Sequence, residues 1–319
     1  MSLLESRESH SSAEGQLTNE RGRPQRFPAD FARRLRPAGT GRDTASAGTA
    51  RLVLRLSDSA AGASFAAGLV TYAFGGFLVG PPVMNGSARG TALVIFLVGA
   101  PALLVSGRRA HNGSTRALLV WAGMAMFLTY NSFMLLAATP LNRLFLLYVA
   151  AFGLAVATMI GIGASIDVAD AARRFDLTLP ARPIAVYLGA VVALNALAWL
   201  ARIIPATVDD RMSELLEGMG LSTVPTYLQD LGFWLPLLAI GAWLLWHRRP
   251  WGYVLAGAGL AFWALEAATI AVDQWFGHRA DPTSDVASIA VVVPFAVLTV
   301  ISVAVLWSFL RYVDRRSHE

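Results

Sequence analysis

The sequence predicts an all-α protein: a polytopic bundle of about eight transmembrane helices with both termini on the cytoplasmic side. The composition is that of a membrane protein, since 55% of the 319 residues are hydrophobic and only 15% are charged, against roughly 25% charged in soluble domains. Long uncharged stretches recur, and a helix needs about 20 apolar residues to cross the hydrocarbon core. Basic residues gather in alternate loops, which is the pattern of a defined membrane topology.

Residues 1–50 are a polar tail that we expect to be disordered and cytoplasmic, because it is rich in Ser, Gly, Glu and Arg and has no apolar period. It is too polar for a signal peptide. Nine Arg lie between residues 21 and 55. They could attract anionic lipid headgroups, or they could simply form a solvated tail that obeys the topology rule. Residues 51–57 could lie at the interface as a lead-in.

A membrane domain over residues 51–313 follows, and a short cytoplasmic tail at 314–319 ends the chain. The eight spans are predicted near 61–80, 90–107, 117–138, 143–166, 183–202, 228–246, 251–272 and 286–310. The second and sixth are the least regular, because they are short and contain Pro101 and Pro236. The third and fourth form a hairpin, in which Thr139 is expected to cap the fourth helix with Pro140 at its first position.

The distribution of Arg supports this number of spans. On the side of the N-terminal tail, the loops and the C-terminus contain Arg108, Arg109, Arg116, Arg173, Arg174, Arg182, Arg248, Arg249, Arg311, Arg315 and Arg316. The alternate loops contain Arg89, Arg143, Arg202, Arg211 and Arg279. Because a missing span would put the alternation out of phase, eight spans with cytoplasmic termini agree best with the positive-inside rule.

One outer loop, residues 203–227, is long and contains a possible interfacial helix. Its apolar residues at i, i+3, i+4 and i+7 are Met212, Leu215, Leu216 and Met219. Such a helix could lie on the outer surface. It could cap a cavity or serve as a plain connector.

Glu266 is the clearest charge inside a predicted span. Charged residues in spans are costly and usually face the bundle interior. Asn131 lies at a similar depth in the third span, with Tyr130 and Ser132 beside it, and Asn195 lies nearer the middle of the fifth. These residues could form a polar binding pocket open to the outside, with Glu266 as proton acceptor or cation ligand. They could equally join helices by interhelical hydrogen bonds.

A second charged set is expected at the outer boundary of the membrane, and it consists of Arg143, Arg202, Asp230 and Asp273. If Arg143 is buried, it could pair with Asp230 or Asp273. If these side chains are exposed, each would extend to the headgroup region.

The missing residue types exclude much chemistry. All 26 basic residues are Arg and there is no Cys, so lysine-dependent phosphate binding, Schiff bases, thiolate catalysis and iron–sulfur clusters are excluded. The five His lie in tails, loops or predicted helix ends, which disfavours a haem held by two His within the membrane. No catalytic motif is present. We therefore expect no catalytic residue, cofactor, metal or nucleic-acid partner, and we lean against an enzyme.

The segments YNSFM…TPLNRLFLLYVA and DLGFWLPLLAIGAWLLWHRRPWGYVLAG resemble uncharacterised multi-pass membrane proteins of bacteria, especially actinobacteria. The resemblance covers the third to seventh spans. It implies a bacterial plasma membrane protein, and it transfers no activity and no site residue.

The expected function is that of a small-solute or ion transporter with a polar site in the outer half of the bundle and an unknown substrate. A non-catalytic membrane partner or sensor is the first alternative, since catalytic motifs are lacking and the tail is basic. An intramembrane enzyme acting on lipid is the second, with no motif in its favour.

Overall fold

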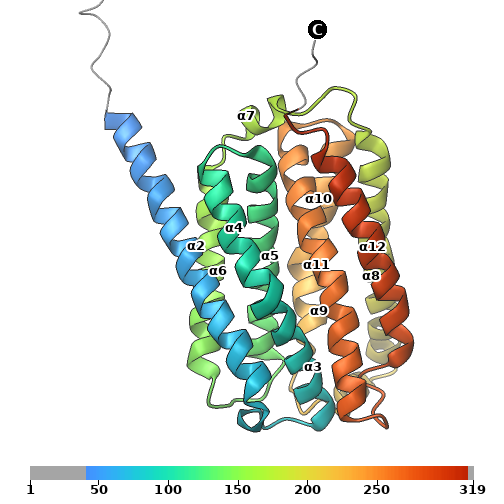
Figure 1. The fold of residues 1–319 in the computed structure, drawn as a ribbon. Coiled ribbons are helices and arrows are strands. Elements are labelled where there is room, and N and C mark those ends of the chain that lie inside the picture. The colour runs from blue at the N-terminus through green and yellow to red at the C-terminus, as the bar shows by residue number, and fades with distance from the viewer. Residues whose placement is uncertain (1–40, 315–319) are drawn as a thin grey trace, which may run out of the picture. The chain divides into compact units, whose positions relative to one another are not determined.

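The computed structural model describes residues 41–314, with side chains from residue 48 onward, and the chain divides into two compact units at Ala47 and Gly48. Of the predicted disordered tail, residues 1–40 lie outside the described part, as do the last residues, 315–319. The described elements are α2 (Gly41–Ala73), η1 (Gly75–Phe77), α3 (Pro82–Val94), η2 (Ile95–Gly99), α4 (Ala100–His111), α5 (Thr115–Ala137), α6 (Phe145–Ser165), α7 (Val168–Arg173), α8 (Ala181–Val208), η3 (Met212–Leu216), α9 (Pro225–Gln229), η4 (Asp230–Trp234), α10 (Leu235–Trp246), α11 (Pro250–Ala280) and α12 (Ile289–Leu310) (Figure 1). The predicted all-α bundle is confirmed.

Seven helical segments of the described chain are long and apolar enough to cross a membrane. They are Pro82–His111, Thr115–Ala137, Phe145–Ser165, Ala181–Val208, Pro225–Trp246, Pro250–Ala280 and Ile289–Leu310. They correspond to the second to eighth predicted spans. The protein is therefore a multi-pass membrane protein by its fold and composition.

The first predicted span differs from expectation. α2 begins at Gly41, before the proposed lead-in, and ends at Ala73, where Gly75 and Gly76 follow, so 74–80 does not continue the helix. It is not among the seven, and it contains the charged residues Arg51, Arg55 and Asp58. Ser57, Ser64 and Thr71, spaced by seven residues, form a buried polar stripe along it. Trp121 Nε1 donates to Ser57 Oγ at 2.8 Å, and the hydroxyls of Thr71 and Tyr148 are 2.7 Å apart. Interhelical bonds of this kind satisfy polar groups within a bundle.

The second and sixth spans are longer than predicted, and both pass through a π-helical turn. The turn Ile95–Gly99 precedes Pro101, and the turn Asp230–Trp234 precedes Pro236. Proline lacks an N–H and its ring displaces the carbonyl one turn earlier, and a π turn accommodates such a defect without ending the helix. The predicted 90–107 and 228–246 are thus parts of Pro82–His111 and Pro225–Trp246.

The hairpin between α5 and α6 also differs in detail. Thr139 Oγ1 donates back to Leu135 O at 2.7 Å, so it does not cap α6. Asn142 Oδ1 instead accepts from Leu144 N at 2.9 Å, and α6 begins at Phe145. Pro140 therefore lies in the turn rather than at the first position of the helix, because the Asn142 side chain completes the turn before the helix starts.

The long loop predicted at residues 203–227 contains only a short 3₁₀ turn, Met212–Leu216, between the end of α8 at Val208 and the start of α9 at Pro225. The predicted apolar periodicity through Met219 does not extend into a longer helix. Arg211 Nη2 instead donates to Asp209 Oδ2 at 2.7 Å.

α11 is the helix around which the membrane unit is packed. Its most apolar stretch is 78% buried, against 6% for α12, and it contacts α3, α5, α10 and α12. Glycine makes the closest approaches possible. A Cβ on Gly123 of α5 would lie 2.5 Å from the carbonyl oxygen of Ala258, and one on Gly90 of α3 would lie 2.7 Å from Cα of Asp273. Small residues at such crossings let membrane helices pack backbone to backbone.

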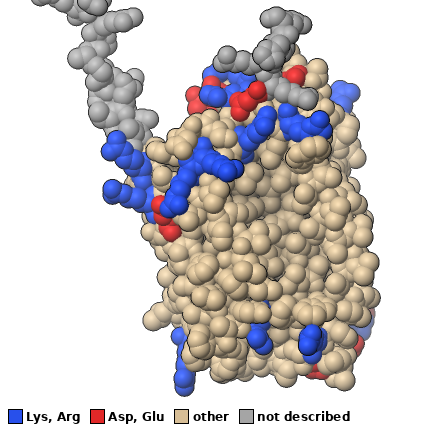
Figure 2. All heavy atoms as spheres, viewed as in Figure 1, with Lys and Arg blue, Asp and Glu red and all other residues tan. Residues whose placement is uncertain are grey.

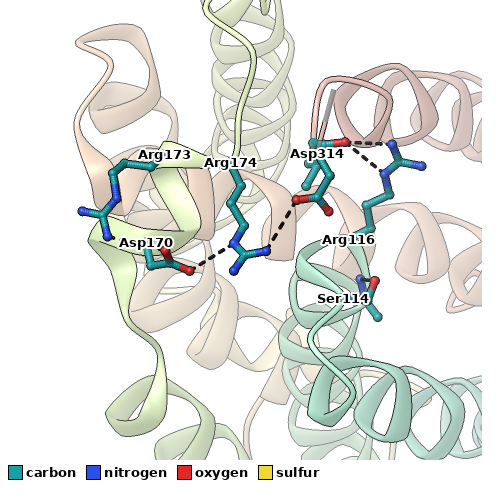
Figure 3. A network of polar contacts seen from close by, with 8 residues as sticks. Ser114, Arg116, Asp170, Arg173, Arg174 and Asp314 are labelled. Carbon is teal, nitrogen blue, oxygen red and sulfur yellow. Dashed lines mark hydrogen bonds and ion pairs between the residues drawn. The ribbon is translucent and has the colours of Figure 1, made fainter. Parts of the chain in front are cut away.

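One end of the membrane unit, here called the Arg-rich end, contains most of the described Arg side chains (Figure 2). It is formed by the end of α4, the start of α5, α7, the turn from α10 to α11 and the end of α12. The chain after α12 is hydrogen-bonded to this end. Arg116 Nη2 donates to Val313 O at 2.7 Å, and Phe175 and Val313 form an isolated β-bridge. Arg174 lies between Asp170 and Asp314, at 3.0 and 3.8 Å (Figure 3).

Gly123→Leu is expected to lower the free energy of unfolding by about 1–3 kcal/mol, as overpacking does in other cores. The new side chain would meet the backbone of α11, which cannot give way as a flexible side chain would. Thermal unfolding in detergent measures the change. Gly189→Leu is the matched control, because a Cβ there has no atom within 4 Å. Equal melting of the two variants would contradict the proposed role of Gly123.

Asp170→Asn is expected to destabilise α7 at neutral pH, and the difference should disappear once pH falls below the lowered folded-state pKa of Asp170. The hydrogen bond from Arg174 lowers the pKa of Asp170. Its contribution is thus present above the ordinary Asp pKa of about 3.9 and is lost as pH falls through the lowered folded-state value. Hydrogen exchange of α7, compared between variant and wild type across pH, measures this. A difference that persists at the lowest pH would exclude titration of Asp170 as its cause.

Candidate functional site

A cavity of about 480 Å³ lies between α5, α8, α10, α11 and α12, in the half of the bundle away from the Arg-rich end. Its polar and aromatic lining comprises Thr91, Tyr130, Asn131, Asn195, Trp199, Arg202, Thr226, Asp230, Trp234, Phe262, Trp263, Glu266, Asp273, Gln274 and Phe295. The volume falls within the range of about 300–1,000 Å³ typical of small-molecule sites. No described residue from 209 to 224 lines this cavity, so the turn at Met212–Leu216 does not cap it.

Asn131 and Glu266 meet in the floor of the cavity. Asn131 Nδ2 donates to Glu266 Oε2 at 2.7 Å, and both side chains are buried, with exposed fractions of 1% and 4%. Each residue lies 16 positions after the start of its helix, Thr115 for α5 and Pro250 for α11. Because the two helices run in the same direction and cross closely at Gly123, equal spacing from their starts becomes equal depth. The sequence predicted this equal depth, and the structure adds the contact.

Asp230 lines the same cavity from the turn before α10. It is 8% exposed and begins the π-helical turn before α10. Trp199 Nε1 of α8 donates to Asp230 Oδ2 at 2.9 Å. π turns occur frequently at functional sites because they reorient a side chain out of the regular helical register. The bond therefore fixes the carboxylate at the cavity wall and joins α8 to the start of α10.

Asn195 and the outer charges are only partly gathered here. Asn195 lines the cavity, but its Nδ2 donates to Val191 O of its own helix at 2.8 Å. Arg202 and Asp273 also line the cavity, and Asp273 Oδ1 is buried without a hydrogen-bond partner.

Two residues of the predicted sets lie elsewhere. Arg143 is exposed and lies beside Phe74 in the turn after α5, outside the cavity. It therefore follows the exposed alternative, and it forms no ion pair with Asp230 or Asp273 among the described residues. Ser132 is 1% exposed, yet it does not line the cavity, because it follows Asn131 on another face of α5.

An aromatic wall faces these polar groups. Trp234 stacks on Phe262 with ring centroids 5.3 Å apart, and Tyr130 lies 6.0 and 5.7 Å from the two rings. Trp199 and Trp263 extend the wall. Offset and tilted arrangements at these distances are favourable for aromatic pairs.

The aromatic wall is the part of the site that sequence reasoning missed. A signal was present, because each Trp lies three or four residues from a polar residue of the site. The pairs are Asn195 with Trp199, Asp230 with Trp234, and Trp263 with Glu266. Residues at this spacing share a helix face.

No group of three or more His, Asp or Glu side chains in the described part of the chain is placed to hold a metal ion. The chemistry that the cavity offers is carboxylate charge, amide hydrogen bonding and aromatic faces. No protein-family model matches the chain, and no curated protein or solved structure is significantly similar to it. The fold and the composition of its spans thus define a class, the multi-pass helical membrane proteins, and the bacterial resemblance remains an expectation from the sequence.

Asn131→Leu and Glu266→Leu are each expected to lower the free energy of unfolding by about 1–3 kcal/mol, since each removes one partner of the buried Asn131–Glu266 hydrogen bond. The double variant should lie closer to wild type than the sum of the two single changes. A double-mutant cycle of unfolding in mixed micelles measures this coupling. Strictly additive effects would mean that the two side chains do not depend on each other.

Proposed function

We propose that this protein transports a small solute or ion, with Glu266 as its proton- or cation-binding group. The observation that carries the proposal is the Asn131–Glu266 pair, with 2.7 Å between Nδ2 and Oε2, in the floor of a cavity of about 480 Å³ within the bundle. Ionisable residues inside membrane spans are costly and mark substrate or proton pathways.

The cavity beside the Asn131–Glu266 pair distinguishes a binding role from a role in helix packing. Polar side chains also join helices for packing alone, and a bond between α5 and α11 would serve that purpose without a neighbouring space. Here the same carboxyl lines a cavity together with Asp230 and Asp273. The combination of a buried acid, an amide that holds it and a space for a ligand supports a binding role.

Each polar residue has a part in this proposal. Asn131 orients Glu266, while Tyr130 and Asn195 supply hydrogen-bonding groups to the ligand. Arg202 and Asp273 supply further charged groups to the lining of the cavity. Ser132 and Arg143 have no part in it, because they lie outside the cavity.

We further propose that the Arg-rich end faces the cytoplasm of a bacterial cell, in keeping with the positive-inside rule. Both termini would then be cytoplasmic, and the cavity would lie in the outer half of the membrane. In an alternating-access cycle, this arrangement is the outward-facing state.

Glu266→Gln is expected to reduce transport at least about tenfold, because the amide keeps the size of the side chain but cannot exchange a proton or carry charge. Protein reconstituted in vesicles is tested by solid-supported-membrane currents evoked by sodium, methylammonium and a panel of amino acids. Glu217→Gln is the matched control, since Glu217 is exposed in the outer loop.

Currents of wild-type size in Glu266→Gln, at equal protein per vesicle, would remove Glu266 from the mechanism. If none of these probes evokes a current in the wild type, the role of a membrane partner or sensor becomes the better explanation.

A further inference from the structure

The cavity is lined by more acidic than basic side chains. Glu266, Asp230 and Asp273 line it, whereas Arg202 is its one basic lining residue in the described chain and is exposed. Arg202 forms no ion pair with any of the three among the described residues. Three carboxyl groups in a low-dielectric cavity favour a ligand that brings positive charge, since opposite charges attract strongly where water is scarce.

The aromatic wall has the same preference. Tyr130, Trp199, Trp234 and Trp263 line the cavity with the acids. The faces of aromatic rings attract cations, above all organic ammonium groups, which are large and weakly hydrated. A small inorganic cation would gain less from this wall, because it loses its hydration shell to reach it.

The remaining wall is apolar and reaches the lipid-facing surface. Leu194 and Ala198 of α8 line one side, and Phe295 and Leu298 of α12 line the other. Leu194 is nevertheless 67% exposed, so this side of the cavity continues to the outer surface of the bundle.

α8 and α12 leave room there because they pack on different helices. α8 packs along α10 and α12 along α11. A hydrogen bond, 2.6 Å between the hydroxyl oxygens of Tyr187 and Ser302, joins α8 and α12 closer to the Arg-rich end. The cavity lies beyond that bond, between the diverging outer halves of the two helices.

We infer that the cavity binds an amphipathic organic cation: an ammonium group beside Glu266, Asp230 and Asp273, with an apolar chain lying between α8 and α12. This names the substrate class of the proposed transporter and rests on that function only for its transport step. Binding itself is a separate property. A ligand of this shape would enter from the outer leaflet of the bilayer, where such molecules concentrate.

Binding of radiolabelled dodecyltrimethylammonium to the full-length protein in nanodiscs, read by scintillation proximity, tests the inference. We expect saturable binding above that of empty nanodiscs. Unlabelled tetramethylammonium, which has the head alone, should displace the probe at least roughly tenfold less well, and dodecanol, which has the chain alone, should not displace it. Displacement by dodecanol, or equal displacement by tetramethylammonium, would overturn the inference.

Variants locate the site. Glu266→Gln and Asp273→Asn should each weaken binding roughly tenfold, the effect of losing one partner of a close charge pair. Leu194→Trp should block the chain, whereas Leu197→Trp should bind normally. Leu197 is the matched control because it is 64% exposed on the same helix but does not line the cavity.

Three variants keep the test decisive if one of them fails to fold. Wild-type binding in every folded variant among Glu266→Gln, Asp273→Asn and Leu194→Trp would overturn the inference. The two proposals fail separately. Currents with sodium or amino acids that depend on Glu266, without binding of the probe, would overturn this inference and leave the transporter. Binding that depends on Glu266 without any current would support the site and count against transport.

Discussion

The close packing of α11 against α3 and α5 is the constraint on which the rest of the bundle depends. Lipid is as apolar as a helix surface, so burying apolar side chains does little to bring membrane helices together. Contact depends instead on how closely backbones can approach. Glycines at positions 86, 90, 123 and 277 remove the side chains that would separate α11 from its neighbours. Larger residues there would move α11 and change the depth of its side chains, Glu266 among them.

The candidate site follows from this packing. Because α5 and α11 are in contact, a polar side chain on each meets the other, and Asn131 donates a hydrogen bond to Glu266. α8 and α12 pack on different helices, so the space on the other side of Glu266 remains open. The close contact between α5 and α11 thus fixes the Glu266 carboxyl, and the looser arrangement of α8 and α12 leaves a cavity beside it.

Several departures from the simplest expectation share a physical cause. α2 presents Ser57, Ser64 and Thr71 to the bundle, where Ser57 and Thr71 find hydrogen-bond partners. The helices that contain Pro101 and Pro236 continue through π turns, since a chain in lipid must satisfy its backbone internally. One of these turns presents Asp230 to the cavity.

The sequence by itself determined the all-α class, the positions of seven spans and the equal depth of Asn131 and Glu266. These depend on composition, run length and rise per residue, which are local properties. Only the tertiary structure decided that the two side chains touch, that Arg143 lies outside the cavity, and that Trp199, Trp234 and Trp263 line it. The depth of a residue along a helix can be counted from the sequence. Which side chain it contacts depends on how the neighbouring helices are placed around it. In a membrane that placement depends on close contacts between small residues, which hydropathy does not record.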